Sequence, residues 1–291
     1  MCRDCGYVVK CNECDVSMTY HLTENKLICH YCGKTLNIPT TCPDCSSKKI
    51  RYFGTGTQKI EQELKKYLPE ASIIRMDVDT TRTKNAHENI LKKFKEENID
   101  ILLGTQMIAK GHDFENVTLV GILAADGSIN IGDYKANEKT YQLLTQVSGR
   151  AGRGDKKGHS IIQTYLSDEF SIISSKEQNY EKFYNTEIIM REKLNYPPFC
   201  DIIVFGISGI NEEVVKESIN ELYNDLKDSF NAYKPAPSPI SKINGEYRWR
   251  ILVKEKINDE KIEIIGNYIN KFQEKNNNVK LNVDINPNNM M

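Results

Sequence analysis

The sequence predicts an α/β protein that combines a cysteine-rich module, a parallel α/β lobe and a small α+β domain. Three observations support this fold class. Eight of the nine cysteines lie within residues 2–45. Apolar runs without polar alternation, typical of strands covered on both faces, recur between helical patterns over residues 50–168. The pattern of residues 199–291 is strand, helix, strand, strand, helix, strand.

The composition is that of a water-soluble chain with two or three domains. Its 291 residues are 39% hydrophobic and 27% charged, which is ordinary for globular proteins. Lys and Arg total 39 against 40 Asp and Glu, so a nucleic-acid partner would need local basic patches. Apolar runs are too short to span a membrane, and the N-terminus is not a signal peptide. We therefore expect a cytoplasmic protein with no membrane partner.

The cysteine-rich module, residues 1–49, contains four C-x-x-C pairs. Each pair directs two sulfurs at one centre, and Zn²⁺ takes four thiolates at about 2.3 Å. Fourteen residues separate Cys14 from Cys29, and their alternating pattern predicts a hairpin and therefore a zinc ribbon. The pattern predicts two nested zinc sites, formed by Cys11, Cys14, Cys29 and Cys32 and by Cys2, Cys5, Cys42 and Cys45.

Other interpretations of the cysteines are weaker. Pairing the first two C-x-x-C units would close a loop of only five residues. Disulfides are rare in cytosolic proteins, and redox activity does not explain four similar pairs. His21 and His30 are possible substitute ligands, but eight cysteines already complete two sites. All-thiolate sites leave no open position for chemistry, so we expect the zinc to be structural.

The α/β lobe, residues 50–168, alternates strands with helices. Strands are predicted at 50–53, 72–76, 100–103, 117–125 and 159–165. Helical patterns end at Leu68, surround Leu91 and cover 139–147. Continuous apolar strands predict one parallel sheet that is covered on both faces. Asp77 and Asp79 are expected to lie in a solvated loop rather than to bind a metal.

Three glycine-containing segments of this lobe are candidate ligand-binding loops. The turn Gly54, Thr55, Gly56, Thr57 opens a helix, where free N–H groups bind phosphate or simply end the helix. Residues 104–114 follow an apolar strand. Residues 146–154 contain three glycines and two arginines, whose guanidinium groups fit phosphate. A solvated surface turn is the alternative for this last segment.

Residues 146–154, QVSGRAGRG, resemble motif VI of superfamily 2 helicases, and GTQMIAKGHDF at 104–114 resembles motif V. With the cysteine insert and the Y-P-P-F element at 196–199, the whole chain resembles the C-terminal part of the PriA family of bacterial replication-restart helicases. This resemblance implies a RecA-like second helicase lobe with a two-zinc insert. It also implies ATP-dependent 3′-to-5′ unwinding, recognition of stalled or branched forks, and primosome assembly.

The resemblance further implies roles for individual residues. The catalytic residues would be Arg150 and Arg153, which sense the γ-phosphate. The nucleotide site would include Gln146, Gly149, Gly104, Thr105 and Asp113. DNA would contact Gly54, Thr55, Gly56, Thr57, Gln106 and Lys110. ATP and Mg²⁺ would be cofactors of the intact protein, and its partners branched and single-stranded DNA, single-strand DNA-binding protein and other primosome proteins.

Two nucleotide-binding signatures are missing from the sequence. Neither the P-loop pattern G-x-x-x-x-G-K-[ST] nor a D-E-x-H pattern occurs. We therefore expect a fragment without its P-loop lobe, which does not hydrolyse ATP alone. The alternative function is a non-enzymatic zinc-ribbon scaffold that binds nucleic acid or protein.

The C-terminal third begins with a predicted helical linker, residues 169–198, followed by a ferredoxin-like α+β domain. Its elements are expected at 200–208, 212–230, 239–243, 247–254, 258–274 and 279–284. Alternation in the fourth element places Arg248 and Arg250 on one face and Tyr247 and Trp249 on the other. A core face with a solvated basic edge explains this pattern, but basic and aromatic residues also suit single-stranded DNA. Because the family's C-terminal domain is implicated in DNA contacts, Arg248 and Trp249 are predicted to bind DNA.

Overall fold

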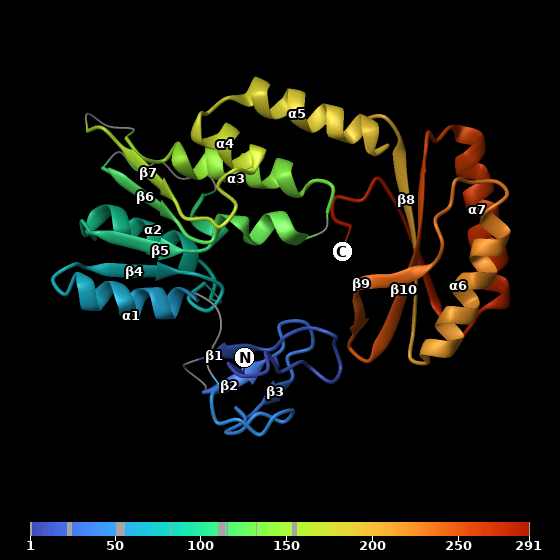
Figure 1. Cartoon of the computed structure of the whole chain (residues 1–291), viewed down its shortest axis with the longest axis horizontal. Coiled ribbons are helices and arrows are strands. Elements are labelled where there is room, and N and C mark those ends of the chain that lie inside the picture. Colours follow the sequence, from blue (N-terminus) through green and yellow to red (C-terminus); the bar gives the residue numbers. More distant parts are fainter. Residues whose placement is uncertain are drawn as a thin grey trace. The chain divides into compact units, whose positions relative to one another are not determined.

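The computed structural model (Figure 1) describes residues 2–21, 25–50, 56–81, 83–109, 114, 116–131, 133–152 and 156–290. Its contacts divide the chain into two units. One unit joins Met1–Phe53 to Ile188–Met291, and the other is Gly54–Glu187. The first and last segments of the sequence therefore belong to one compact unit, although the whole of the other unit lies between them in the sequence.

The cysteine-rich module contains a small antiparallel sheet. Its strands are β1 (Thr19–His21), β2 (Lys26–Ile28) and β3 (Thr35–Leu36), in that order across the sheet. The first two strands pair Thr19 with Ile28 and His21 with Lys26. This pairing confirms the hairpin predicted between the second and third C-x-x-C pairs.

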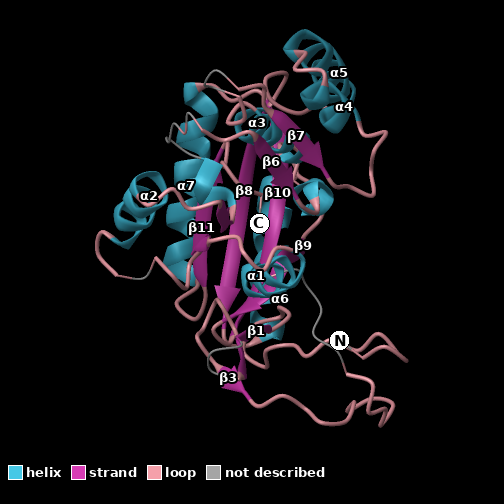
Figure 2. Cartoon of the chain, turned by 90° about the vertical axis from the view of Figure 1, so that its left-hand side faces the viewer, coloured by secondary structure: helices cyan, strands magenta, loops and turns pink. Residues whose placement is uncertain are grey.

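The C-terminal domain in the same unit has the predicted order of elements. These are β8 (Asp201–Gly209), α6 (Glu212–Leu226), β9 (Ala236–Ile243), β10 (Glu246–Glu255), α7 (Asp259–Lys275) and β11 (Lys280–Ile285). The strands form one antiparallel sheet in the order β11-β8-β10-β9. Figure 2 shows β8, β10 and β11 running side by side. The predicted β-α-β-β-α-β fold is confirmed.

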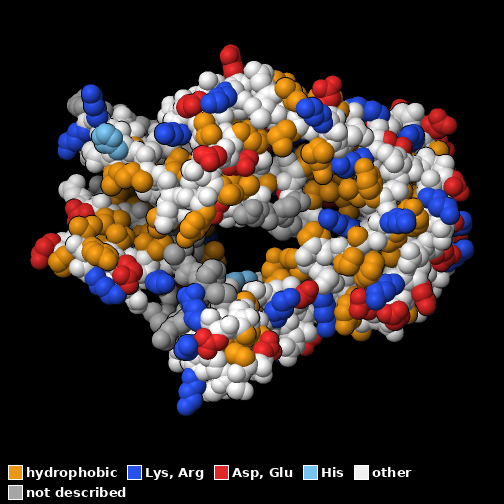
Figure 3. Space-filling model, in the orientation of Figure 1, with side chains coloured by type: hydrophobic (Ala, Val, Ile, Leu, Met, Phe, Trp, Pro, Cys, Tyr) orange, Lys and Arg blue, Asp and Glu red, His pale blue; other side chains and the backbone are white. Residues whose placement is uncertain are grey.

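The two helices of this domain cover one face of the sheet (Figure 1). Buried residues of α6 recur at helical spacing and meet the inward side chains of β8 and β10. This core contains Phe205, Ile207, Val215, Ile219, Leu222, Ile251, Val253 and Phe272. Lys271 pairs with Asp225 and Lys275 with Glu221 across the two helices. Basic and acidic side chains alternate over α6 and α7 on the face shown in Figure 3.

The other unit alternates strands with helices, as predicted. Its elements are α1 (Thr57–Tyr67), β4 (Ile73–Met76), α2 (Ala86–Glu96), β5 (Ile101–Gly104), η1 (Gln106–Ala109), β6 (Leu119–Ile122), η2 (Ala125–Ile131), α3 (Ala136–Ser148), β7 (His159–Ile162) and α4 (Phe170–Lys176). Helix α5 (Tyr180–Lys193) follows and crosses into the first unit. The predicted linker therefore begins within this unit, where Phe183 stacks on Tyr141 with ring centroids 4.3 Å apart.

The sheet of this unit differs from the expectation. Within the described ranges, the strands form two parallel pairs, β4 with β5 and β6 with β7, rather than one hydrogen-bonded sheet. Leu119 and Ile161 are 59% and 61% exposed, so the second pair is not covered on both faces. The strand expected over 117–125 ends at Ile122, because Ala124 adopts a left-handed conformation (φ 52°) before η2. Apolar runs predict the strands but do not specify which strands pair.

Across the residues that the structure describes, no helix has the length and apolar character needed to span a membrane.

Candidate functional site

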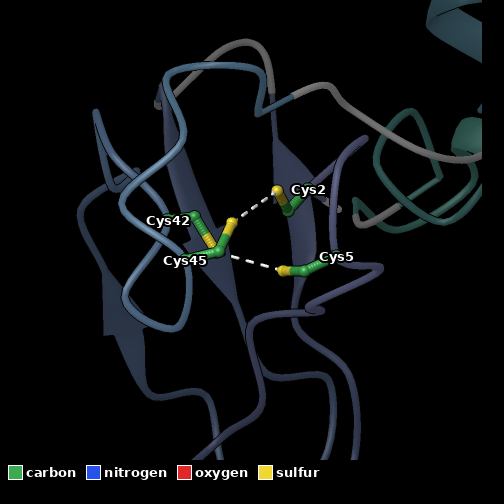
Figure 4. A group of neighbouring side chains, drawn as sticks. All are labelled: Cys2, Cys5, Cys42 and Cys45. Atoms are coloured by element: carbon green, nitrogen blue, oxygen red, sulfur yellow. Dashed lines mark hydrogen bonds between the residues drawn. The ribbon is translucent and has the colours of Figure 1, made fainter.

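The outer cysteine group brings the first and last C-x-x-C pairs together (Figure 4). A backbone bridge between Cys2 and Ile50 joins the two ends of the module. The Sγ atoms of Cys2 and Cys45 lie 3.6 Å apart, and those of Cys5 and Cys42 lie 3.5 Å apart. Four sulfurs at about 2.3 Å from a tetrahedral Zn²⁺ would lie about 3.8 Å from one another. A disulfide needs about 2 Å, so the spacing fits a metal site.

The inner cysteine group forms from the second and third C-x-x-C pairs, on either side of the β1–β2 hairpin. Its Sγ atoms lie within 4.8 Å of one another, with 3.6 Å between Cys11 and Cys32. Cys14 and Cys29 are completely buried (0% exposed), beside Met18 and Leu27. The structure thus brings the cysteines together in the nested arrangement, and the sequential pairing is wrong.

Backbone N–H groups favour the thiolate form in both groups. Hydrogen bonds from the backbone of Cys5 and Asp4 lower the pKa of Cys2 to about 6. For Cys29, burial acts to raise the pKa, but the backbone of Cys32 and Tyr31 outweighs it and lowers the pKa to about 7. Each group therefore contains one cysteine whose pKa is lowered, and the thiolate is the form that binds metal.

Gly104 is the last residue of β5, Thr105 follows it, and Gln106 begins η1. A Cβ atom at Gly104 would collide with the main-chain carbonyl of Met76, at the end of the neighbouring strand. The close approach of the neighbouring strand therefore favours glycine at this position. Lys110 and Asp113 lie outside the described residues.

The loop after α3 contains the predicted arginines. Gly149 caps the helix, with its N–H donating to Thr145 O. The Nη2 group of Arg150 donates to the carbonyl oxygen of Ala109, 2.9 Å away. The structure therefore joins this loop to the end of η1, which no local pattern in the sequence predicts. Gln146 lies on the last turn of α3, and Arg153 lies outside the described residues.

The turn before α1 is only partly described, because Gly54 and Thr55 lie outside the described residues. Gly56 is the N-cap of α1, and Thr57 begins the helix. The Thr57 hydroxyl donates to Asp77 Oδ2 at 2.5 Å, which ties the start of α1 to the end of β4.

The interpretation of Asp77 as a solvated loop residue is wrong. Its exposed fraction is 6%, and its carboxylate pairs with Arg75 Nε at 2.8 Å. Burial acts to raise the pKa of Asp77, but hydrogen bonds from Thr57 and Thr80 and the charge of Arg75 outweigh it and lower the pKa. The ionised Asp77 carboxylate therefore binds Arg75, Thr57 and Thr80 together at the end of β4.

Strand β10 places Arg248 and Trp249 on opposite faces of the sheet. Trp249 is partly buried against the core, with Lys216 Nζ 5.6 Å from its ring centroid. Arg250 donates to the carbonyl oxygen of Met290, and burial lowers its pKa. The structure thus gives Trp249 a packing role, as in the alternative interpretation of this strand, and does not bring it onto one surface with Arg248.

Family models match three regions of the chain. The "Primosomal protein N C-terminal domain" matches residues 192–288, and the "PriA DNA helicase Cys-rich region (CRR) domain" matches 11–36. The "Helicase conserved C-terminal domain" matches 41–155. Fold, cysteine groups and matches together define a protein with a helicase C-terminal domain and a zinc-ribbon cysteine-rich region.

Relatives of the chain carry the name replication restart protein PriA. The protein of Bacillus subtilis (strain 168) is 48% identical over 100% of the chain and 37% of its own length. That of Synechocystis is 43% identical over 87% of the chain and 31% of its own length. That of Haemophilus influenzae is 32% identical over 99% of the chain and 40% of its own length. The chain belongs to the PriA family, and it spans less than half the length of these relatives.

Proposed function

We propose that the chain forms part of an ATP-dependent 3′-to-5′ DNA helicase that recognises stalled or branched replication forks. The observation that carries the proposal is the hydrogen bond from Arg150 to Ala109, which joins the two loops that resemble helicase motifs. The names of the relatives indicate replication restart as the process. The partners would be branched and single-stranded DNA, single-strand DNA-binding protein and other primosome proteins, in the bacterial cytoplasm.

In the proposed nucleotide site, this chain supplies positively charged arginines, and another lobe of the protein holds the phosphates of ATP. Arg150 and Arg153 stabilise the negative charge that develops on the γ-phosphate of ATP. The hydrogen bond to Ala109 orients the Arg150 guanidinium and connects it to the loop after β5. Mg²⁺ would neutralise charge on the same phosphates. A P-loop must hold them from another lobe, because the sequence has no such pattern.

The remaining residues would contact either the nucleotide or DNA. The nucleotide surface would include Gln146, Gly149, Gly104, Thr105 and Asp113. DNA would contact Gly54, Thr55, Gly56, Thr57, Gln106 and Lys110 of the α/β unit, and Arg248 of the C-terminal domain would contact DNA separately. Because the Thr57 hydroxyl already donates to Asp77, the backbone N–H groups of its turn would make the phosphate contacts.

The cysteine groups would each hold one structural Zn²⁺. Four thiolates close the coordination sphere and leave no position for a reacting water. The inner ligands are Cys11, Cys14, Cys29 and Cys32, and the outer ligands are Cys2, Cys5, Cys42 and Cys45.

The first test is ATP hydrolysis by this chain, with and without forked DNA. We expect no turnover, because the sequence has no P-loop to hold the phosphates. DNA-stimulated turnover by the chain alone would contradict the placement of the phosphates on another lobe.

The second test places Arg150→Ala in a full-length family protein that carries this segment. We expect ATP turnover to fall by a factor of about 10³ or more, with the thermal unfolding midpoint and the binding of forked DNA retained. Arg150→Lys should recover little, because an ammonium group cannot replace the planar guanidinium. Arg248→Ala is the contrasting variant, and should weaken DNA binding while turnover at saturating DNA is kept. Unchanged turnover in Arg150→Ala would instead favour a non-enzymatic scaffold. The cysteine sites alone would suit that function, because four thiolates leave no position for a reacting water.

A further inference from the structure

The turn between β9 and β10 lies directly on the inner cysteine group. Asn244 and Gly245 form this two-residue turn, with φ angles of 52° and 81°. The backbone N–H of Asn244 donates to Cys14 Sγ at 3.3 Å. The N–H of Gly245 donates to the carbonyl oxygen of Glu13 at 2.8 Å. Two consecutive backbone amides of the C-terminal domain therefore donate hydrogen bonds to the segment that carries the Cys11–Cys14 pair.

The end of strand β9 contacts the same C-x-x-C pair. The Asp15 N–H donates to Lys242 O at 3.0 Å, and the Ser241 hydroxyl donates to Asp15 Oδ2 at 2.9 Å. Lys242 Nζ donates to Asn12 O at 3.3 Å. Residues 241–245 thus hold the backbone and side chains of residues 12–15 by hydrogen bonds at several points.

An apolar contact accompanies these hydrogen bonds. Ile243 packs against the cluster that contains Met18, Leu27 and three of the inner cysteines. Cys14 is completely buried, so water does not stabilise the charge of its thiolate. A hydrogen bond to the ligand sulfur supplies part of that stabilisation, and such partners of metal ligands contribute substantially to metal affinity.

We propose that the C-terminal domain is built into the inner metal site, where its β9–β10 turn holds the Cys11–Cys14 pair in the geometry that binds a divalent metal ion. Metal binding and docking of the C-terminal domain on the cysteine-rich module then stabilise each other, since coupling between two binding equilibria is reciprocal. The inference rests on the assignment of a metal to these cysteines and not on helicase activity, so its outcome is independent of the ATPase tests.

Metal release tests one direction of the coupling. The zinc-loaded chain carries Cys42→Ser and Cys45→Ser, which leaves the inner site as the source of metal, and release to a chromophoric chelator is followed in time. Adding Ile243→Ala should accelerate release by about tenfold or more. Ile262→Ala, at a half-exposed position of α7, is the matched control and should leave the rate unchanged. Fluorescence of Trp249, the single tryptophan, verifies that the C-terminal domain stays folded.

Hydrogen exchange tests the other direction. Replacing Cys29 and Cys32 by serine removes half of the inner site without touching the residues that contact the turn. Exchange of the Asn244 and Gly245 amides should then rise sharply, while amides of β8 stay protected. Serine at Cys42 and Cys45 should leave the turn protected. Equal release rates with and without Ile243→Ala, or unchanged protection of the turn after loss of the inner site, would overturn the proposal.

Discussion

Individual glycines in the α/β unit differ in how much space surrounds them. Gly104 lies at the end of β5, where a side chain would meet the carbonyl of Met76. Gly121 lies in β6, where nothing in the described part of the chain is within 4 Å of an added Cβ. Both glycines stand in apolar strands of the sequence, so only the neighbouring backbone distinguishes them.

We therefore expect Gly104→Ala to lower the free energy of unfolding by about 2 kcal/mol, because the carbonyl of Met76 must move. Gly121→Ala is the matched control, and it should change the free energy by no more than about 0.5 kcal/mol. Urea unfolding followed by far-ultraviolet circular dichroism measures both. Equal effects of the two substitutions would show that the contact with Met76 does not limit this position.

At the scale of residues, the sequence predicts sites that depend on local spacing. The four C-x-x-C pairs carry their geometry within four residues each, so the two cysteine groups follow from the pattern. The environment of Asp77 does not, because its hydroxyl partner Thr57 lies 20 residues earlier. Likewise, alternation places Trp249 on a face of β10 but does not state that α6 covers that face.

Among the elements, the two long helices of the C-terminal domain each begin with an asparagine N-cap. The Asn211 side chain accepts hydrogen bonds from the N–H groups of Glu213 and Val214 at the start of α6. Asn258 accepts from Lys261 N at the start of α7. Acidic residues fill both first turns, which suits the positive end of the helix dipole.

Asn211→Ala should lower the free energy of unfolding of the C-terminal domain by about 1 kcal/mol, because two N–H groups lose their acceptor. Asn220→Ala changes the same residue type within α6, where the side chain is exposed, and should not lower stability. Trp249 fluorescence during urea unfolding reports on both. A cap contribution is ruled out if the two variants unfold at the same midpoint.

The boundaries of elements are less predictable than their order. Strand β9 begins at Ala236, although prolines at 237 and 239 favour a later start. It is an edge strand, paired only with β10 in the described sheet, so prolines without N–H donors are tolerated. The pairing of β4 with β5 and of β6 with β7 depends on backbone contacts, which the apolar pattern of each strand does not encode.

For the molecule as a whole, the sequence does not reveal that its two ends form one unit. The hydrogen bond between Asn244 and Cys14 joins residues 230 positions apart. Neither segment predicts a contact with the other, since a two-residue turn and a C-x-x-C pair are each complete as local motifs. Only the folded chain shows that one is the partner of the other.

Metal removal should affect the two parts of this unit differently. A strong chelator should unfold the cysteine-rich module, whose small core consists largely of ligand residues, and expose its eight module cysteines to a thiol reagent. The sheet of β8, β9, β10 and β11 should remain folded, because its core contains no cysteine of either group. Thiol titration and the thermal transition of Trp249 fluorescence measure these outcomes. Loss of the Trp249 transition upon chelation would show that the C-terminal domain does not stay folded without metal.

The nested arrangement of the cysteines also orders the assembly of the module during synthesis. Cys11 and Cys32 are 21 residues apart, whereas Cys2 and Cys45 are separated by 43. On the ribosome, the inner four ligands are complete before Cys42 is made, and they close the shorter loop at the lower cost in chain entropy. The outer site can form only afterwards, once Cys42 and Cys45 have been made. The turn that contacts Cys14 is translated 230 residues after it, so the inner site meets this partner only long after its four ligands have been made.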